Sequence, residues 1–265
     1  MREFFGFGGY NREPEGFMSW QHLVFVSTLV LIMIALAVYL GIKNRGRSDK
    51  EKNRVLIWAA LLIDGFELFK IVLCCFRSGN PLDWVCNLPL FLCSIQLITI
   101  PLAAFSRGRM KEAALDFVLV FGILGALLGT YGAGNNYGAY PVLSFDNVVS
   151  GITHCISGFA SLYIAISGMA SMKRKNIPLS LGILSVFCIL AYLANRLLPA
   201  FNLNYMFLMR GDGTPYDLLY NLLSGNAVLY PLSVVLLFFL YIFAFTCIFG
   251  AVKAKKAQKK AVLDK

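Results

Sequence analysis

A cysteine and a histidine, Cys93 and His154, fall at matching depths of two predicted membrane segments. His154 lies about seven residues inside the outer end of the segment 147–169, or about 10 Å down at 1.5 Å per residue, and Cys93 lies at a similar depth in the segment 86–105. An imidazole that faces a thiol can remove its proton, and the thiolate can attack a carbonyl carbon. A cysteine in a membrane helix is more often a small packing residue. The pair is therefore a candidate for catalysis, with packing as the alternative.

Charged residues in the segment 53–76 form a second candidate group. Asp64, Glu67 and Lys70 are spaced by three residues, which places them along one side of a helix, where Glu67 and Lys70 can pair. An ionisable side chain in hydrocarbon costs about 2.5–3.5 kcal/mol, so this side should face the interior of the protein. The pair indicates either a polar site or a buried ion pair that fixes helix packing.

Other polar residues are predicted near the same layer of the membrane. Asn195 or Gln96 would stabilise an oxyanion, and Arg196 or Lys70 would hold an anionic head group. His22 begins the first segment at the outer interface. Together with Glu67, these residues predict a substrate-binding site in the outer half of the bilayer.

The elements that must position these residues are membrane helices. Of the 265 residues, 58% are hydrophobic and only 14% are charged, a balance typical of membrane proteins. Apolar runs long enough to span a bilayer occur at about 21–42, 53–76, 86–105, 112–132, 147–169, 179–200 and 227–250. Short connections join them, so we expect an all-α, polytopic membrane protein with one seven-helix bundle domain over 1–265.

Lysine and arginine alternate between the connections of this bundle. They gather in the connections at 43–54 and 107–111, at 173–175 and in the basic tail 251–265, and are sparse elsewhere. By the positive-inside rule these parts are cytoplasmic, which puts the N-terminus outside and the C-terminus inside the cell. We expect a multi-pass protein of the plasma membrane.

The same composition argues against other classes of protein. The net charge of +10 comes mostly from basic runs beside apolar segments, which favours contact with anionic lipids and argues against binding to nucleic acid. The seven cysteines form neither a disulfide framework nor a zinc spacing. Two histidines and scattered carboxylates do not make a metal ligand set, so we expect no metal and no cofactor.

Several motifs resemble the YwaF-like integral membrane proteins of bacteria, relatives of animal transmembrane protein 164. The run Asn87-Leu88-Pro89-Leu90-Phe91-Leu92-Cys93-Ser94 is similar to the Leu-Pro-Leu-His-Leu-Cys-Ser signature of that family. Further matches, in order along the chain, are Trp20-Gln21-His22-Leu23, Glu67, Lys70, His154 and Asn204-Tyr205-Met206-Phe207-Leu208. The signature histidine is replaced here by Phe91, which cannot exchange a proton.

The resemblance implies a phospholipid acyltransferase or acyl hydrolase that uses a cysteine and a histidine. It places the nucleophile at Cys93 or at Leu90. A leucine side chain has no nucleophilic group, so the implied mechanism requires the nucleophile to be Cys93. With Cys93 as nucleophile and His154 as base, the substrate would be a membrane phospholipid or another lipid. The alternative is a protein that uses the same pocket to bind or transport a lipid or small molecule without catalysis.

Overall fold

The computed structural model describes the backbone of residues 2–263 and side chains as far as Val252. All secondary structure in this part of the chain is helical. The chain forms two compact units, Met1–Ala170 and Ser171–Lys265, which we describe separately. The first contains α1 (Trp20–Asn44), α2 (Asp49–Ser78), η1 (Asp83–Asn87), α3 (Gln96–Phe105), α4 (Gly108–Thr130), α5 (Gly134–Ala139) and α6 (Phe145–Ser167). The second contains η2 (Arg174–Asn176), α7 (Ile177–Leu197), η3 (Pro199–Phe201), η4 (Tyr205–Phe207), α8 (Tyr216–Leu222) and α9 (Leu229–Leu263).

Five helical stretches are long and apolar enough to cross a membrane. They are Trp20–Asn44, Gly108–Ala139, Phe145–Ser167, Arg174–Leu197 and Leu229–Val252. Helix α2 has 30 residues, which is long enough, but its many charged side chains set it apart from these five. The side chains of the predicted basic tail from residue 253 onward lie outside the described residues.

The predicted helix over 86–105 is wrong in its first half. Only Gln96–Phe105 forms an α-helix, and residues 88–95 run as irregular backbone between η1 and α3. Pro89 explains part of this, because proline disfavours the helical conformation of the residue before it, and Leu88 is extended at φ −59° and ψ 143°. The apolar run therefore continues through a segment that turns, which we call the 88–95 segment.

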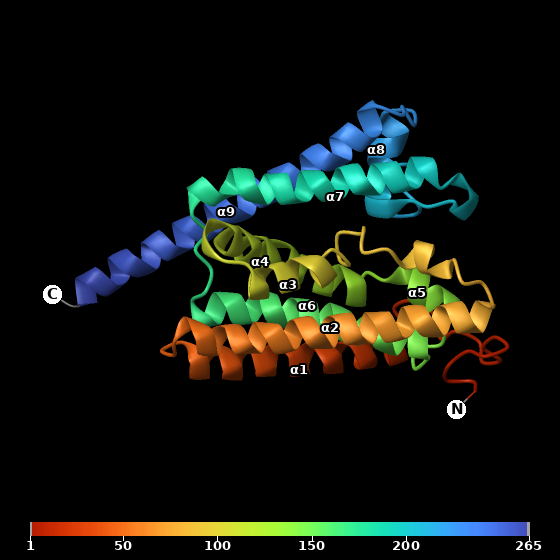
Figure 1. Cartoon of the computed structure of the whole chain (residues 1–265), viewed down its shortest axis with the longest axis horizontal. Coiled ribbons are helices and arrows are strands. Elements are labelled where there is room, and N and C mark those ends of the chain that lie inside the picture. Colours follow the sequence, from red (N-terminus) through yellow and green to blue (C-terminus); the bar gives the residue numbers. More distant parts are fainter. Residues whose placement is uncertain (1, 264–265) are drawn as a thin grey trace. The chain divides into compact units, whose positions relative to one another are not determined.

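Helix α6 lies at the centre of the first unit and packs against α1, α2 and α4 (Figure 1). Small residues bring α4 and α6 close together. The Ser161 hydroxyl donates to the Leu119 carbonyl at 2.8 Å, and the Ser157 hydroxyl donates to the Gly122 carbonyl at 3.3 Å. Close approach of this kind is what drives helix association in lipid, where apolar side chains gain little by leaving it.

Short polar motifs fix the helix ends in the first unit. Ser48 and Glu51 form a capping box at the start of α2, and Gly79 ends that helix in the left-handed conformation. Ser144 caps α6 by accepting a hydrogen bond from the main-chain N–H of Asn147. At the opposite end of α6, the Tyr163 hydroxyl donates to the Lys52 carbonyl at 3.1 Å. The end of α6 is thus tied to the start of α2.

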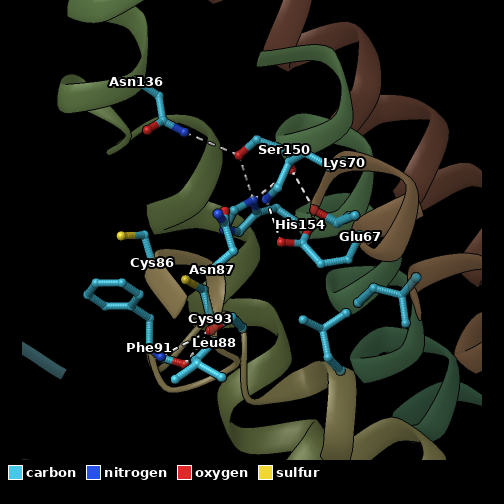
Figure 2. A pocket seen from close by; sticks show the side chains of 14 residues that line it. Glu67, Lys70, Cys86, Asn87, Leu88, Phe91, Cys93, Asn136, Ser150 and His154 are labelled. Carbon is cyan, nitrogen blue, oxygen red and sulfur yellow. Dashed lines mark hydrogen bonds and ion pairs between the residues drawn. The ribbon is translucent and has the colours of Figure 1, made fainter. Parts of the chain in front are cut away.

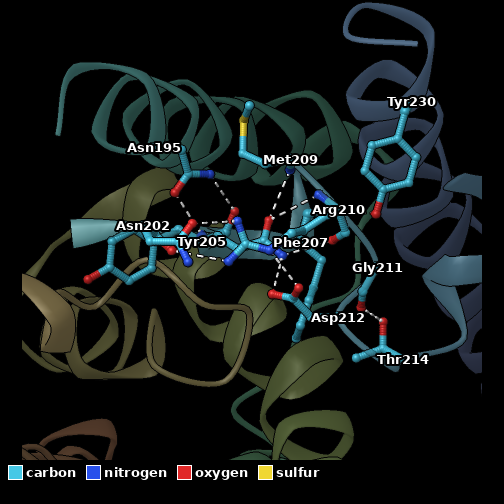
Figure 3. Close-up of polar contacts among 11 residues, drawn as sticks. Asn195, Asn202, Tyr205, Phe207, Met209, Arg210, Gly211, Asp212, Thr214 and Tyr230 are labelled. Carbon is cyan, nitrogen blue, oxygen red and sulfur yellow. Dashed lines mark hydrogen bonds and ion pairs between the residues drawn. The ribbon is translucent and has the colours of Figure 1, made fainter. Parts of the chain in front are cut away.

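In the second unit, side-chain amides hold the connection between α7 and α8 (Figure 3). The amide oxygen of Asn204 accepts from the main-chain N–H groups of Met209 and Arg210, and its nitrogen donates to the carboxylate of Asp212 at 2.7 Å. Met206 has a positive φ of 54°, which is costly for a side chain of this kind. The amide contacts keep this strained turn in place.

Candidate active site

A cavity of about 270 Å³ lies inside the first unit, lined by the 88–95 segment, α2 and α6 (Figure 2). It gathers four of the residues that the sequence singled out: Glu67, Lys70, Cys93 and His154. Irregular backbone at membrane depth is tolerated only where it is buried in protein or lines a cavity, and the 88–95 segment meets that condition. The turn in this segment is what brings Cys93 to the cavity.

His154 has a defined tautomer. Its Nδ1 lies 2.6 Å from the main-chain carbonyl oxygen of Ser150, one turn earlier in α6. A carbonyl oxygen can only accept, so Nδ1 carries the proton and Nε2 of the neutral ring is an acceptor. The side chains of His154 and Cys93 line the same cavity and interact electrostatically. With Nδ1 engaged by Ser150, Nε2 is the nitrogen that is free to take the thiol proton.

Main-chain N–H groups also surround the thiol of Cys93. Those of Cys93 itself and of Ser94 lie near the sulfur. In the described part of the chain, no main-chain carbonyl accepts from either of them. Ser94 holds this turn closed, because its hydroxyl accepts from the N–H of Phe91 at 3.0 Å. Free N–H groups beside a nucleophile can stabilise an oxyanion that forms on the carbonyl it attacks.

Two glycines of α4 make room for this pair. A Cβ at Gly129 would lie 1.8 Å from Cδ2 and 2.1 Å from Nε2 of His154, and a Cβ at Gly125 would lie 3.3 Å from Cα of Cys93. The two glycines are four residues apart and so share one face of the helix. The main chain of Cys93 and the imidazole of His154 therefore pack against two positions of α4 that carry no side chain.

An ion pair forms another wall of the cavity. The ammonium of Lys70 lies 2.5 Å from a carboxylate oxygen of Glu67, and the two side chains are 18% and 11% exposed. Each charge is thus neutralised by its partner on the same helix, as burial in low dielectric requires. An anionic group of a ligand would have to compete with Glu67 for Lys70.

A second polar cavity, of about 420 Å³, shares Lys70, Cys86, Asn87, Asn136 and Ser150 with the first. We call it the vestibule. At its far wall the guanidinium of Arg77 makes a bidentate pair with Asp146, at 2.6 and 2.9 Å. The hydroxyl of Tyr10 donates to the same carboxylate at 2.5 Å. Burial and this hydrogen bond raise the pKa of Tyr10 to about 12.

A model of the TMEM164 family matches residues 17–249, which include every residue of both cavities. The chain belongs to the TMEM164 family. No curated protein and no solved structure matches it. Membership, together with the apolar helices, makes this chain an integral membrane protein.

Two other predicted binding residues of this TMEM164-family protein lie away from the cavity lining. The Nδ1 of His22 accepts from the main-chain N–H of Met18 at 3.2 Å, and its Nε2 donates to the Thr130 carbonyl at 3.1 Å. Gln96 is fully buried, and its side-chain oxygen accepts from the Thr99 hydroxyl at 3.0 Å. His22 therefore ties α1 to α4, and Gln96 begins α3 beneath the cavity-lining segment.

The remaining two, Asn195 and Arg196, belong to the second unit. The side-chain amide of Asn195 makes two hydrogen bonds to the main chain of Tyr205. Its nitrogen donates to the Tyr205 carbonyl at 3.1 Å, and its oxygen accepts from the Tyr205 N–H at 2.8 Å. Arg196 lies over the ring of Tyr192, with its guanidinium carbon 5.4 Å from the ring centroid. Within this unit Asn195 thus contacts main chain, and Arg196 contacts the ring of Tyr192 and donates to its hydroxyl at 3.3 Å.

The family member's cavity also contains residues that the sequence analysis did not select. Asn136 and Ser150 line it, as does Phe91, the position of the signature histidine. Serine and asparagine are common in helices and turns of every kind, so their types gave no signal. In the described residues no group of three or more His, Cys, Asp or Glu side chains could hold a metal ion.

Proposed function

We propose that this TMEM164-family protein is a membrane acyltransferase or acyl hydrolase in which Cys93 is the nucleophile and His154 the general base. One observation carries the proposal: the thiol shares a cavity with an imidazole whose Nδ1 proton is held by the Ser150 carbonyl. This is the arrangement of a nucleophile, a base and a group that orients the base. Here the orienting group is a carbonyl oxygen of the same helix.

The reaction would proceed in two halves. In the first, Nε2 of His154 takes the thiol proton, the thiolate of Cys93 attacks the carbonyl carbon of an acyl ester, and the imidazolium returns the proton to the leaving alkoxide. A thioester on Cys93 and a free alcohol result. In the second, His154 removes a proton from an acceptor alcohol or water, which attacks the thioester, and the departing thiolate recovers the proton. The N–H groups of Cys93 and Ser94 would stabilise the oxyanion in both halves.

The substrate we propose is a membrane phospholipid or another lipid ester. The cavity lies among helices of a membrane protein, and it joins a polar vestibule that could accept a head group. Lys70 belongs to both spaces, so its ammonium could contact a phosphate while the ester reaches Cys93. The apolar side chains of Ile63, Leu88, Phe91 and Leu97 would contact the start of an acyl chain.

The experiment is single-turnover acyl transfer by the purified protein. Phospholipid with a labelled acyl chain is added, and the acyl-enzyme is trapped and mapped by mass spectrometry. We expect label on Cys93 that neutral hydroxylamine releases, as it does from a thioester, and no label in Cys93→Ala or in His154→Gln. Cys155→Ser is the matched control, because Cys155 is a buried cysteine of α6 that lines neither polar cavity. Label on a different residue, or full labelling of His154→Gln, would refute the mechanism.

A non-catalytic binding protein is the second candidate, and Phe91 is the observation that favours it. Phe91 lines the cavity in place of the signature histidine. If that change removed the chemistry, lipid would copurify without turnover, and Phe91→His would create turnover that the natural protein lacks. Acyl transfer by the natural protein would exclude this second candidate.

We also propose that α2 crosses the membrane, with the N-terminus of the protein outside the cell and a total of seven membrane passages. Its ion pair faces the cavity, while its outer surface exposes apolar side chains such as Trp58, Leu62 and Phe69. Such a helix hides its charge from lipid. On intact cells, an impermeant thiol reagent should label Ser78→Cys and not Ser48→Cys in a background without reactive cysteines. The reverse pattern would overturn the orientation.

A further inference from the structure

Asn136 lies where the cavity and the vestibule meet, since it lines both. It comes from α5, the short helix between α4 and α6. Its side-chain nitrogen donates to the Ser150 hydroxyl oxygen at 3.4 Å, and that oxygen lies 3.3 Å from Nδ1 of His154 (Figure 2). A chain of contacts thus leads from the edge of the vestibule to Nδ1 of His154.

The Ser150 hydroxyl gives His154 something that the Ser150 carbonyl alone does not. A hydroxyl oxygen has two lone pairs, so it can accept from Asn136 and still accept from Nδ1–H. When His154 takes the thiol proton, its ring becomes cationic, and a second oxygen beside Nδ1–H stabilises that state. Without Asn136, the hydroxyl is free to rotate, so its lone pairs are no longer held toward Nδ1–H.

The surroundings of His154 make this oxygen important. The ionisable groups that line the cavity with it are the thiols of Cys93 and Cys86 and the Glu67–Lys70 pair, and the residue of α4 against it is Gly129. In the described residues no carboxylate is hydrogen-bonded to His154, so the carboxylate partner common in other nucleophile–base pairs is absent. Oxygens of Ser150 take that place.

We infer that Asn136 and Ser150 are positioning residues for His154: Asn136 orients the Ser150 hydroxyl so that its oxygen shares the Nδ1 proton with the Ser150 carbonyl. This rests on the proposed role of His154 as base for Cys93. It adds a residue from α5, outside the 88–95 segment that carries the nucleophile and the helix that carries the base, and so links the edge of the vestibule to the reactivity of the thiol.

The test is a double-mutant cycle read by thiol reactivity. The full-length protein in detergent is alkylated with iodoacetamide at neutral pH, and the rates at Cys93 and Cys86 are measured by peptide mass spectrometry. Cys86 lines the same cavity and is exposed, so it serves as the internal reference. Loss of one hydrogen bond corresponds to about tenfold, so Ser150→Ala and Asn136→Ala should each slow Cys93 about tenfold and leave Cys86 unchanged.

The double variant decides the mechanism. If Asn136 acts through the hydroxyl, Asn136→Ala has no further effect once Ser150 is alanine, and Ser150→Thr, which keeps a hydroxyl, retains most of the rate. Additive losses in the double variant, equal slowing of Cys86, or no effect of Asn136→Ala would overturn the inference. Thiol reactivity is separate from acyl transfer: absent turnover with the expected alkylation pattern would refute the proposed function and leave this relay standing.

Discussion

Replacing Gly129 by alanine should separate the imidazole from the thiol without unfolding the protein. The added Cβ would lie 1.8 Å from Cδ2 of His154, whereas ordinary contacts begin near 3.4 Å, so the ring must move by about 1.5 Å. A displacement of about 1 Å in a catalytic group costs about 100-fold in rate. We therefore expect acyl transfer to fall at least about 100-fold, which corresponds to about 2.7 kcal/mol in activation free energy. Overpacking costs about 1–3 kcal/mol of stability, part of which the higher helix propensity of alanine offsets.

The assay compares three glycine variants in acyl transfer and in alkylation of Cys93. Gly65→Ala is the matched control, because Gly65 is also helical and a Cβ there meets nothing within 4 Å. Gly125→Ala should give an intermediate loss, since its Cβ would be 3.3 Å from Cα of Cys93 and requires a shift of only a few tenths of an ångström. Rates for Gly129→Ala within threefold of the natural protein, in folded material, would refute the reasoning that α4 sets the position of His154.

Three further outcomes follow from the contacts. The raised pKa of Tyr10, about 12, means that its contribution to stability is complete below about pH 10 and is lost as pH rises toward 12. The melting temperature of Tyr10→Phe should therefore fall less between pH 10 and pH 12 than that of the natural protein. Arg77→Ala should lower the free energy of unfolding by about 3 kcal/mol, because Asp146 is left buried without its cation. Arg77→Lys should recover only part of this loss. A loss below about 1 kcal/mol for Arg77→Ala, measured by denaturant titration, would contradict this prediction. Asn195→Ala should cost about 1–3 kcal/mol, because both main-chain groups of Tyr205 lose their partner, and an unchanged melting temperature would argue against the clamp.

The apolar pattern predicted the helices well because a membrane helix needs a long uninterrupted apolar run. Helices cover six of the seven predicted segments, with ends a few residues away from the expected ones except for α9, which continues to Leu263. The exception is the segment 86–105, where hydrophobicity could not distinguish a spanning helix from backbone that turns beside a cavity. Pro89 was the local signal, and it lay near the expected segment end, where proline is also common.

Depth counting brought Cys93, His154, Glu67 and Lys70 to one layer, and these four residues line one cavity. Their catalytic and binding roles stay predictions. The counting worked because rise per residue is fixed in a helix. It could not distinguish a polar side chain that faces a cavity from one that satisfies main chain at the same depth.

The sequence could not predict which backbone groups shape the site. The Ser150 carbonyl, the N–H groups of Cys93 and Ser94, and the missing side chain at Gly129 shape the site, yet every residue has a carbonyl and nearly every residue has an N–H. Their role comes from where the 88–95 segment turns and from which face of α4 meets α6. Tertiary packing sets both.

Loss of the signature histidine at Phe91 is compatible with catalysis for a reason rooted in sulfur chemistry. A serine alkoxide is a poor leaving group, but a thiolate is stable at neutral pH, so breaking a thioester needs little help from an acid. The one imidazole at His154 can then serve both half-reactions, as base in each and as acid only toward the alcohol that leaves first. Phe91 contributes an apolar wall to the cavity, and a drier cavity strengthens the contacts of Cys93 with His154 and with the N–H of Ser94. A single thiol–imidazole pair is therefore sufficient for the chemistry proposed here.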